Sequence, residues 1–165
     1  MTSSLLDLDA LARAPLVREP FDFAVVPRFI RAEALDAVER DFPDIRTPGS
    51  FPPSTLRYGP SFRALIAELQ GPALATAMGK KLDLPLSSLP TMLTVRGHTG
   101  AHDGRIHYDR RGKVVTALLY FNRDWQEKTG WLRMLRSADN LEDYAAEVAP
   151  EIGTLLLFRC TENAW

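Results

Sequence analysis

Hydrophobic residues recur with a helical period in the first half of the chain and with a strand-like pattern in the second half. Pro43 ends a run of apolar residues at the three- and four-residue spacing of a helix with one buried face, namely Ile30, Ala34, Leu35, Val38 and Phe42. An aromatic and β-branched stretch at 21–26 predicts an early strand. The spacing predicts helices within residues 1–14, 30–42, 61–69 and 73–80.

The pattern changes near residue 91, where side chains begin to alternate between two faces. Residues 91–96 alternate in this way, which is typical of a strand. Residues 114–121 carry no charge and are rich in β-branched, aliphatic and aromatic side chains, as in a strand buried on both faces. Further strands are predicted at 106–109, 131–135, 147–149 and 154–159. Helices that precede a strand-rich half indicate an α+β fold.

Composition and charge are those of an ordinary globular protein. The 165 residues are 45% hydrophobic and 25% charged, which suffices for one domain with a sizeable core. A net charge of -1 gives no electrostatic reason to expect nucleic acid or an anionic membrane as a partner. The single Cys160 excludes an internal disulfide framework, and no apolar run approaches the ~18 residues of a membrane span. We therefore expect a soluble, cytoplasmic, single-domain protein.

His107 and Asp109 stand two residues apart in a predicted strand or strand end. Side chains at this spacing point the same way, so an imidazole and a carboxylate converge. Two histidines and one carboxylate form the facial site that holds Fe(II) and leaves other positions open for chemistry. An ordinary polar turn also produces this pair often, so its meaning depends on the surrounding residues. The pair predicts two protein ligands of a metal site that needs a third.

The residues that follow this pair form an ordered set of motifs. After His107-Tyr108-Asp109 come Lys113, the strand Val-Thr-Ala-Leu-Leu-Tyr-Phe-Asn at 115–122, Trp125, Gly130, and Pro-Glu-Ile-Gly-Thr-Leu-Leu-Leu-Phe at 150–158. In this order, over about residues 88–165, they resemble the 2-oxoglutarate- and Fe(II)-dependent dioxygenases, specifically the prolyl 4-hydroxylase-like group. Thr129 departs from that pattern, because the family usually has a first glycine there.

The resemblance implies a helical part at 1–85 packed on a jelly-roll, or double-stranded β-helix, at 88–165. A helical turn between Ser137 and Tyr144 belongs to the same pattern. In such a fold the metal lies in the mouth of the barrel, with ligands from strand ends. In the family, further strands, a second metal histidine and a basic residue for 2-oxoglutarate follow the position of Trp165. We therefore expect the third ligand beyond Trp165, and expect residues 1–165 alone to be a truncated and inactive form.

The resemblance also assigns residues to the 2-oxoglutarate pocket. Tyr120 matches the tyrosine that hydrogen-bonds the remote carboxylate of 2-oxoglutarate. Thr116 and Leu118 lie on the same side of the predicted strand and would line that pocket. Arg96 occupies, by approximate alignment, a pocket-facing position on the preceding strand. A structural hydrogen bond for Tyr120 and an ordinary surface position for Arg96 stay open as alternatives.

The implied activity is hydroxylation of an unactivated C–H bond, with decarboxylation of 2-oxoglutarate to succinate. His107 and Asp109 would be the catalytic metal ligands, the cofactors would be Fe(II) and 2-oxoglutarate, with ascorbate as an additional candidate, and the substrate would be a small molecule or a protein. Two other classes stay open. A non-catalytic jelly-roll module could bind a ligand or a partner protein without a working metal site. A zinc hydrolase could use His98 and His102 with His107, although these spacings do not match a short zinc motif.

Overall fold

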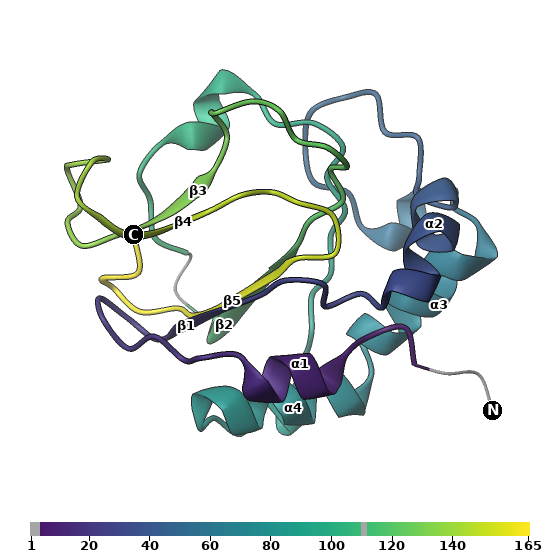
Figure 1. Cartoon of the computed structure of the whole chain (residues 1–165), viewed down its shortest axis with the longest axis horizontal. Helices are drawn as coiled ribbons and strands as arrows, with labels where there is room; N and C mark the ends of the chain where they lie inside the picture. Colours follow the sequence, from purple (N-terminus) through teal and green to yellow (C-terminus); the bar gives the residue numbers. More distant parts are fainter. Residues whose placement is uncertain (1–3, 110–111) are drawn as a thin grey trace. The chain divides into compact units, whose positions relative to one another are not determined.

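The computed structural model describes residues 4–109 and 112–165, which divide into two compact units (Figure 1). The helical unit consists of the segment up to Leu8 together with Ile30–Gly104. The sheet unit consists of Asp9–Phe29 together with Arg105–Trp165. The segment Asp9–Phe29 therefore groups with the C-terminal strands.

The helices of the helical unit follow the predicted apolar faces. They are α2 (Ala32–Arg40), α3 (Pro60–Leu69) and α4 (Pro72–Leu82). Ala34 and Val38 form the buried face of α2, which contacts α3. Both α3 and α4 begin with a proline, whose missing N–H costs nothing at the first helical position. Shorter 3-10 turns lie at Pro53–Thr55, Leu86–Ser88 and Ala101–Gly104. The N-terminal helix α1 (Leu8–Arg13), which apart from Leu8 belongs to the sheet unit, is shorter than the predicted range.

The sheet unit holds two antiparallel sheets. The first has the strand order β1 (Phe23–Val26), β5 (Leu155–Arg159) and β2 (Val115–Leu119). The second pairs β3 (Leu132–Leu135) with β4 (Tyr144–Val148). In the first sheet Thr116 lies opposite Phe158 and Leu118 opposite Leu156. Residues directly opposite each other share a face, so this register fixes which side chains of β2 and β5 meet.

A hydrophobic cluster joins the two sheets face to face. Phe23 and Leu156 of the first sheet and Met134 and Val148 of the second belong to the same buried cluster. Leu118, Tyr120 and Phe158 are partly buried against it. The face of β2 that carries Thr116, Leu118 and Tyr120 therefore looks toward the second sheet. Mixed helices and antiparallel sheets agree with the predicted α+β class, while the jelly-roll stays a prediction.

Three predicted elements take a different form. Residues 91–96 make a single antiparallel bridge between Val95 and Phe51 instead of a strand. Residues 106–109 are a loop, since alternation makes a chain extended but a strand also needs a partner along its length. The predicted helical turn at 137–144 is a bend and a turn, in which the Asn140 side chain accepts a hydrogen bond from the Glu142 N–H at 2.9 Å. Such side-chain bonds compete with helical ones.

No helix in the described parts of the chain is long and apolar enough to cross a membrane.

Candidate functional site

The carboxylate of Asp109 lies at the centre of a polar cluster in the sheet unit. Its Oδ1 atom is 3.1 Å from Nζ of Lys113, and its Oδ2 atom accepts a short hydrogen bond from the Thr116 hydroxyl. The Cys160 thiol lies 3.6 Å from the same Oδ2 atom. Only 17% of the Asp109 side chain is exposed, so these groups replace much of its hydration. We call these four residues the Asp109 cluster.

Strand pairing assembles most of this cluster. The N–H of Cys160 donates to the carbonyl of Val114 at 2.9 Å, which continues the pairing of β5 with β2. This register places Cys160 diagonally from Thr116 on the same face, with Sγ 3.3 Å from Oγ1. Gly112, at a φ of 98°, adopts a backbone conformation that favours glycine and brings Lys113 back toward Asp109.

The electrostatics of the cluster keep the acid ionised and the thiol protonated at neutral pH. Burial alone would raise the pKa of Asp109, but hydrogen bonds from Thr116 and Lys113 and the charge of Lys113 outweigh it and lower the pKa. Burial, together with the neighbouring Asp109 charge, raises the pKa of Cys160. The cluster therefore presents a carboxylate beside a neutral hydroxyl and a neutral thiol.

His107 precedes Asp109 in an exposed loop. Its Nδ1 atom lies 2.8 Å from the carbonyl oxygen of Arg105, and because a carbonyl only accepts, Nδ1 carries the hydrogen. In the neutral ring this tautomer leaves the lone pair on Nε2, the arrangement that histidine ligands of metals use. The partners of Asp109 named above are Lys113, Thr116 of β2 and Cys160, which directly follows β5. The hydrogen bond of His107 goes to Arg105 and not to any of these three residues.

Tyr120 and Leu118 continue the face of β2 that begins at Thr116. Both are half-buried against the cluster between the sheets. At ~3.3 Å per residue, Tyr120 stands roughly 13 Å along the chain from Thr116. Burial raises the pKa of Tyr120 to about 12, so its hydroxyl is a neutral hydrogen-bond donor at physiological pH. On this face, Thr116 near one end is hydrogen-bonded to the Asp109 carboxylate, and the phenol of Tyr120 lies near the other end.

Arg96 belongs to the helical unit. Its guanidinium contacts Ser50 Oγ at 3.0 and 3.2 Å and Asp103 Oδ1 at 3.3 Å, and 44% of its side chain is exposed. His98 is also in this unit, and the side chain of His102 lies outside the described residues. Within the described ranges, no group of three or more histidine, cysteine or acidic residues is placed to hold a metal ion. The pocket role of Arg96 stays a prediction.

Sequence reasoning missed the part that Cys160 and Lys113 play around Asp109. Cys160 served only to exclude disulfides, although its position two residues after Phe158 places it on the face of Thr116 once β5 pairs with β2. Lys113 appeared as a motif residue without a role, although it stands four residues after Asp109, across a glycine turn. The spacing to Lys113 is a local signal, whereas the contact with Cys160 depends on strand register.

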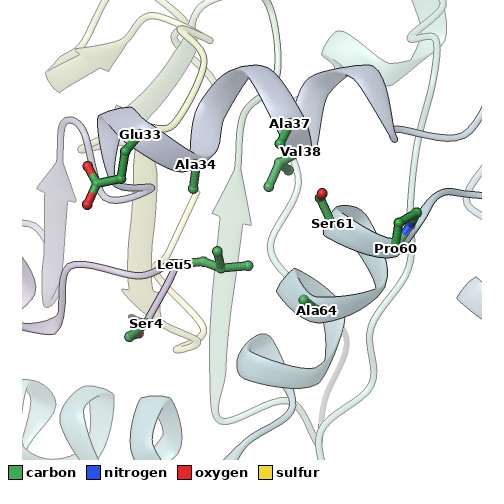
Figure 2. Close-up of a pocket in the computed structure, with 9 residues that line it drawn as sticks. All are labelled: Ser4, Leu5, Glu33, Ala34, Ala37, Val38, Pro60, Ser61 and Ala64. Carbon is green, nitrogen blue, oxygen red and sulfur yellow. The ribbon is translucent and has the colours of Figure 1, made fainter. Parts of the chain in front are cut away.

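A separate cavity of about 390 Å³ lies in the helical unit between α2, α3 and the segment Ser4–Leu5. Figure 2 shows Leu5 extending between Ala34 of α2 and Ala64 of α3. Small and apolar side chains form most of its wall, with the Glu33 carboxylate as its one charged group among the lining residues. None of the predicted site residues lines this cavity.

No family model, curated protein or solved structure matches the chain.

Proposed function

We propose that this chain is the metal-ligating part of a 2-oxoglutarate- and Fe(II)-dependent dioxygenase of the prolyl 4-hydroxylase-like group. The observation that carries the proposal is the Thr116 hydrogen bond to Asp109, because it ties the His-x-Asp loop to the strand face that ends in Tyr120. The motif order along residues 107–158 and the two packed antiparallel sheets, which a jelly-roll also contains, support it.

Two of the three donors that Fe(II) requires are of the right chemical type. Asp109 is an ionised carboxylate, and His107 keeps the Nε2 lone pair for a ligand while Nδ1 bonds to a backbone carbonyl. Nitrogen and oxygen donors of this kind suit Fe(II). The third donor, a histidine, is proposed to come from outside residues 1–165, at the position that the family pattern gives it.

The residues of the proposed site have separate roles in the reaction. When bound, Fe(II) supplies the oxidation of a substrate C–H bond by dioxygen, with conversion of 2-oxoglutarate to succinate and carbon dioxide. His107 and Asp109 hold the ion, and the neutral Tyr120 hydroxyl donates a hydrogen bond to the remote carboxylate of 2-oxoglutarate. Leu118 lies between Thr116 and Tyr120 on one face of the strand, where it would exclude water and so strengthen these polar contacts.

A non-catalytic ligand-binding or protein-binding module is the second candidate. The observation that favours it is the engagement of both Asp109 oxygens by Lys113 and Thr116, which a purely structural acid would also show. In that case the cluster would stabilise the sheet and hold no ion.

Succinate formation tests the proposal. The longest natural chain that contains residues 1–165 is incubated with Fe(II), 2-oxoglutarate and oxygen, and succinate is measured. His107→Ala and Asp109→Ala should each abolish the product, because each removes a ligand from a site with only three. His98→Ala is the matched control and should keep it. More than a few per cent of turnover in both ligand variants would contradict the site, and absence of succinate with the parent chain would favour the binding module.

A further inference from the structure

We propose that Thr116 and Cys160 act as positioning residues that hold the Asp109 carboxylate in one orientation for metal binding. This inference rests on the proposed function. It gives Thr116 a different role from the pocket-lining one that the sequence suggested, and it gives a role to Cys160, which had none.

The hydroxyl of Thr116 and the thiol of Cys160 both lie beside the same oxygen of Asp109. The Thr116 hydroxyl donates to Oδ2 of Asp109, and the Cys160 thiol lies 3.6 Å from that same oxygen. The thiol also lies 3.3 Å from the Thr116 oxygen. The single thiol hydrogen therefore either reaches Oδ2 directly or reaches the hydroxyl that already donates to Oδ2. In the first arrangement the thiol is a second donor to Oδ2, and in the second it polarises the hydroxyl that donates to Oδ2, so both arrangements add to the restraint on that oxygen.

The supporting groups are rigid because strand pairing places them. Thr116 lies within β2 opposite Phe158, and the Cys160 N–H bonds to the Val114 carbonyl beside it. Lys113 differs, since 39% of its side chain is exposed and its flexible stem reaches the other oxygen, Oδ1. An exposed lysine contributes little directional restraint. Thr116 and Cys160, which contact Oδ2, therefore fix the orientation of the Asp109 carboxylate more than Lys113 does.

A further partner can still bind the carboxylate. An ionised carboxylate offers about four acceptor positions on its two oxygens. Lys113, Thr116 and Cys160 use at most three of them. The cluster therefore orients Asp109 and leaves an acceptor position of its carboxylate open, as residues that hydrogen-bond to a metal ligand do.

Metal affinity tests the inference first. Binding of Mn(II), which takes the same donor types without oxidising in air, is measured by calorimetry on the longest natural chain containing residues 1–165. Thr116→Val keeps the side-chain shape and removes the donor, so Mn(II) should bind roughly 10- to 100-fold more weakly. Cys160→Ala should show a smaller loss. Thr116→Ser and Cys160→Ser keep donors and should restore binding to within a few-fold of the parent.

Thr55→Val is the matched control, because the Thr55 hydroxyl also makes a hydrogen bond, to the Pro52 carbonyl at 2.8 Å, in the helical unit. It should leave Mn(II) affinity unchanged. Equal losses in Thr55→Val and Thr116→Val would overturn the inference, and so would an unchanged affinity in Thr116→Val.

A metal-free measurement separates this inference from the proposed function. Urea unfolding without metal is compared for Thr116→Val, Asp109→Asn and the double variant. A hydrogen-bonded pair should show a coupling of roughly 2- to 150-fold in the unfolding constant. Additive effects would overturn the inference whether or not metal binds. Clear coupling in a parent chain that binds no Mn(II) would instead overturn the proposed function, and with it the positioning role, leaving a structural hydrogen bond.

Discussion

The indole ring of Trp165 packs edge to face against the phenol ring of Tyr108, with 5.1 Å between the ring centroids and 83° between the planes. Tyr108 stands between His107 and Asp109. The carbonyl of Trp165 accepts a hydrogen bond from the Leu135 N–H at 3.0 Å, so β3 anchors the backbone at this end. The contact between Tyr108 and Trp165 therefore restrains the loop that carries the two proposed ligands, His107 and Asp109.

Trp165→Ala should loosen the ligand loop without unfolding the sheets. Edge-to-face pairs contribute about 0.5–1.5 kcal/mol beyond the area that they bury. We expect faster hydrogen exchange at the amides of residues 105–109, while the amides of β2 and β5 stay protected. Trp165→Phe keeps an aromatic ring and should restore slow exchange. Equal exchange in the parent and the alanine variant would show that the ring contact does not restrain the loop.

Tyr120→Phe should weaken 2-oxoglutarate binding. The change would remove the proposed hydrogen bond to a charged group, worth about 1.5 to 3 kcal/mol, so the apparent affinity should fall roughly 10- to 150-fold. The measurement is the KM for 2-oxoglutarate in the succinate assay. Tyr58→Phe is the matched control, because Tyr58 packs on Phe62 in the helical unit through its ring. An unchanged KM in Tyr120→Phe would make that hydroxyl a structural group.

The elements that sequence predicted well are those with a local signal. The three- and four-residue spacing around Ala34 and Val38 gave α2, and both side chains are buried. The uncharged run at 114–121 and the run that ends at Arg159 predicted β2 and β5. The prediction that 114–121 is buried on both faces is wrong, because β2 lies at the edge of its sheet and Ala117 is exposed. The placement of Thr116, Leu118 and Tyr120 on one face was also predictable, because side chains two residues apart in a strand point the same way.

The features that sequence did not predict depend on partners far away in the chain. Residues 91–96 alternate like a strand, but Val95 bridges only Phe51. The contact between Cys160 and Asp109 joins residues 51 positions apart, and it follows from the register between β2 and β5. Neither spacing nor composition contains that register, since shifting a strand by one residue turns every side chain to the other face.

Leu156→Ala should strongly destabilise the sheet unit. Leu156 is fully buried in the central strand β5, within the cluster that joins the two sheets. Removing its side chain leaves a cavity, and the free energy of unfolding should fall by about 2–5 kcal/mol. Leu141→Ala makes the same substitution at a side chain that is 47% exposed, and it should change stability by less than about 0.5 kcal/mol. Urea unfolding at neutral pH measures both. Similar losses in the two variants would contradict the face-to-face packing of the sheets.

Asp41 caps α3 from a distant position in the sequence. The residue before that helix, Gly59, has no side chain to cap it, and the Asp41 carboxylate instead accepts a hydrogen bond from the Ser61 N–H at 2.7 Å. The Asp41 carbonyl also accepts from the Gly59 N–H at 2.9 Å. The first of these bonds is the largest reason that the pKa of Asp41 lies below its ordinary value of 3.8, with Arg40 adding a favourable charge.

Because its pKa is lowered, ionised Asp41 should stabilise the folded protein at neutral pH, and this stabilisation should be lost in acid. The unfolded chain has the ordinary pKa, so the contribution is fully present above 3.8 and disappears as the pH falls through the lower folded value. Asp41→Asn keeps an acceptor oxygen but cannot titrate. The parent should exceed Asp41→Asn in urea midpoint at neutral pH, and this difference should shrink as the pH falls below 3.8 and through the lower folded pKa. Curves that stay parallel over this range would show that the Asp41 charge does not stabilise the start of α3.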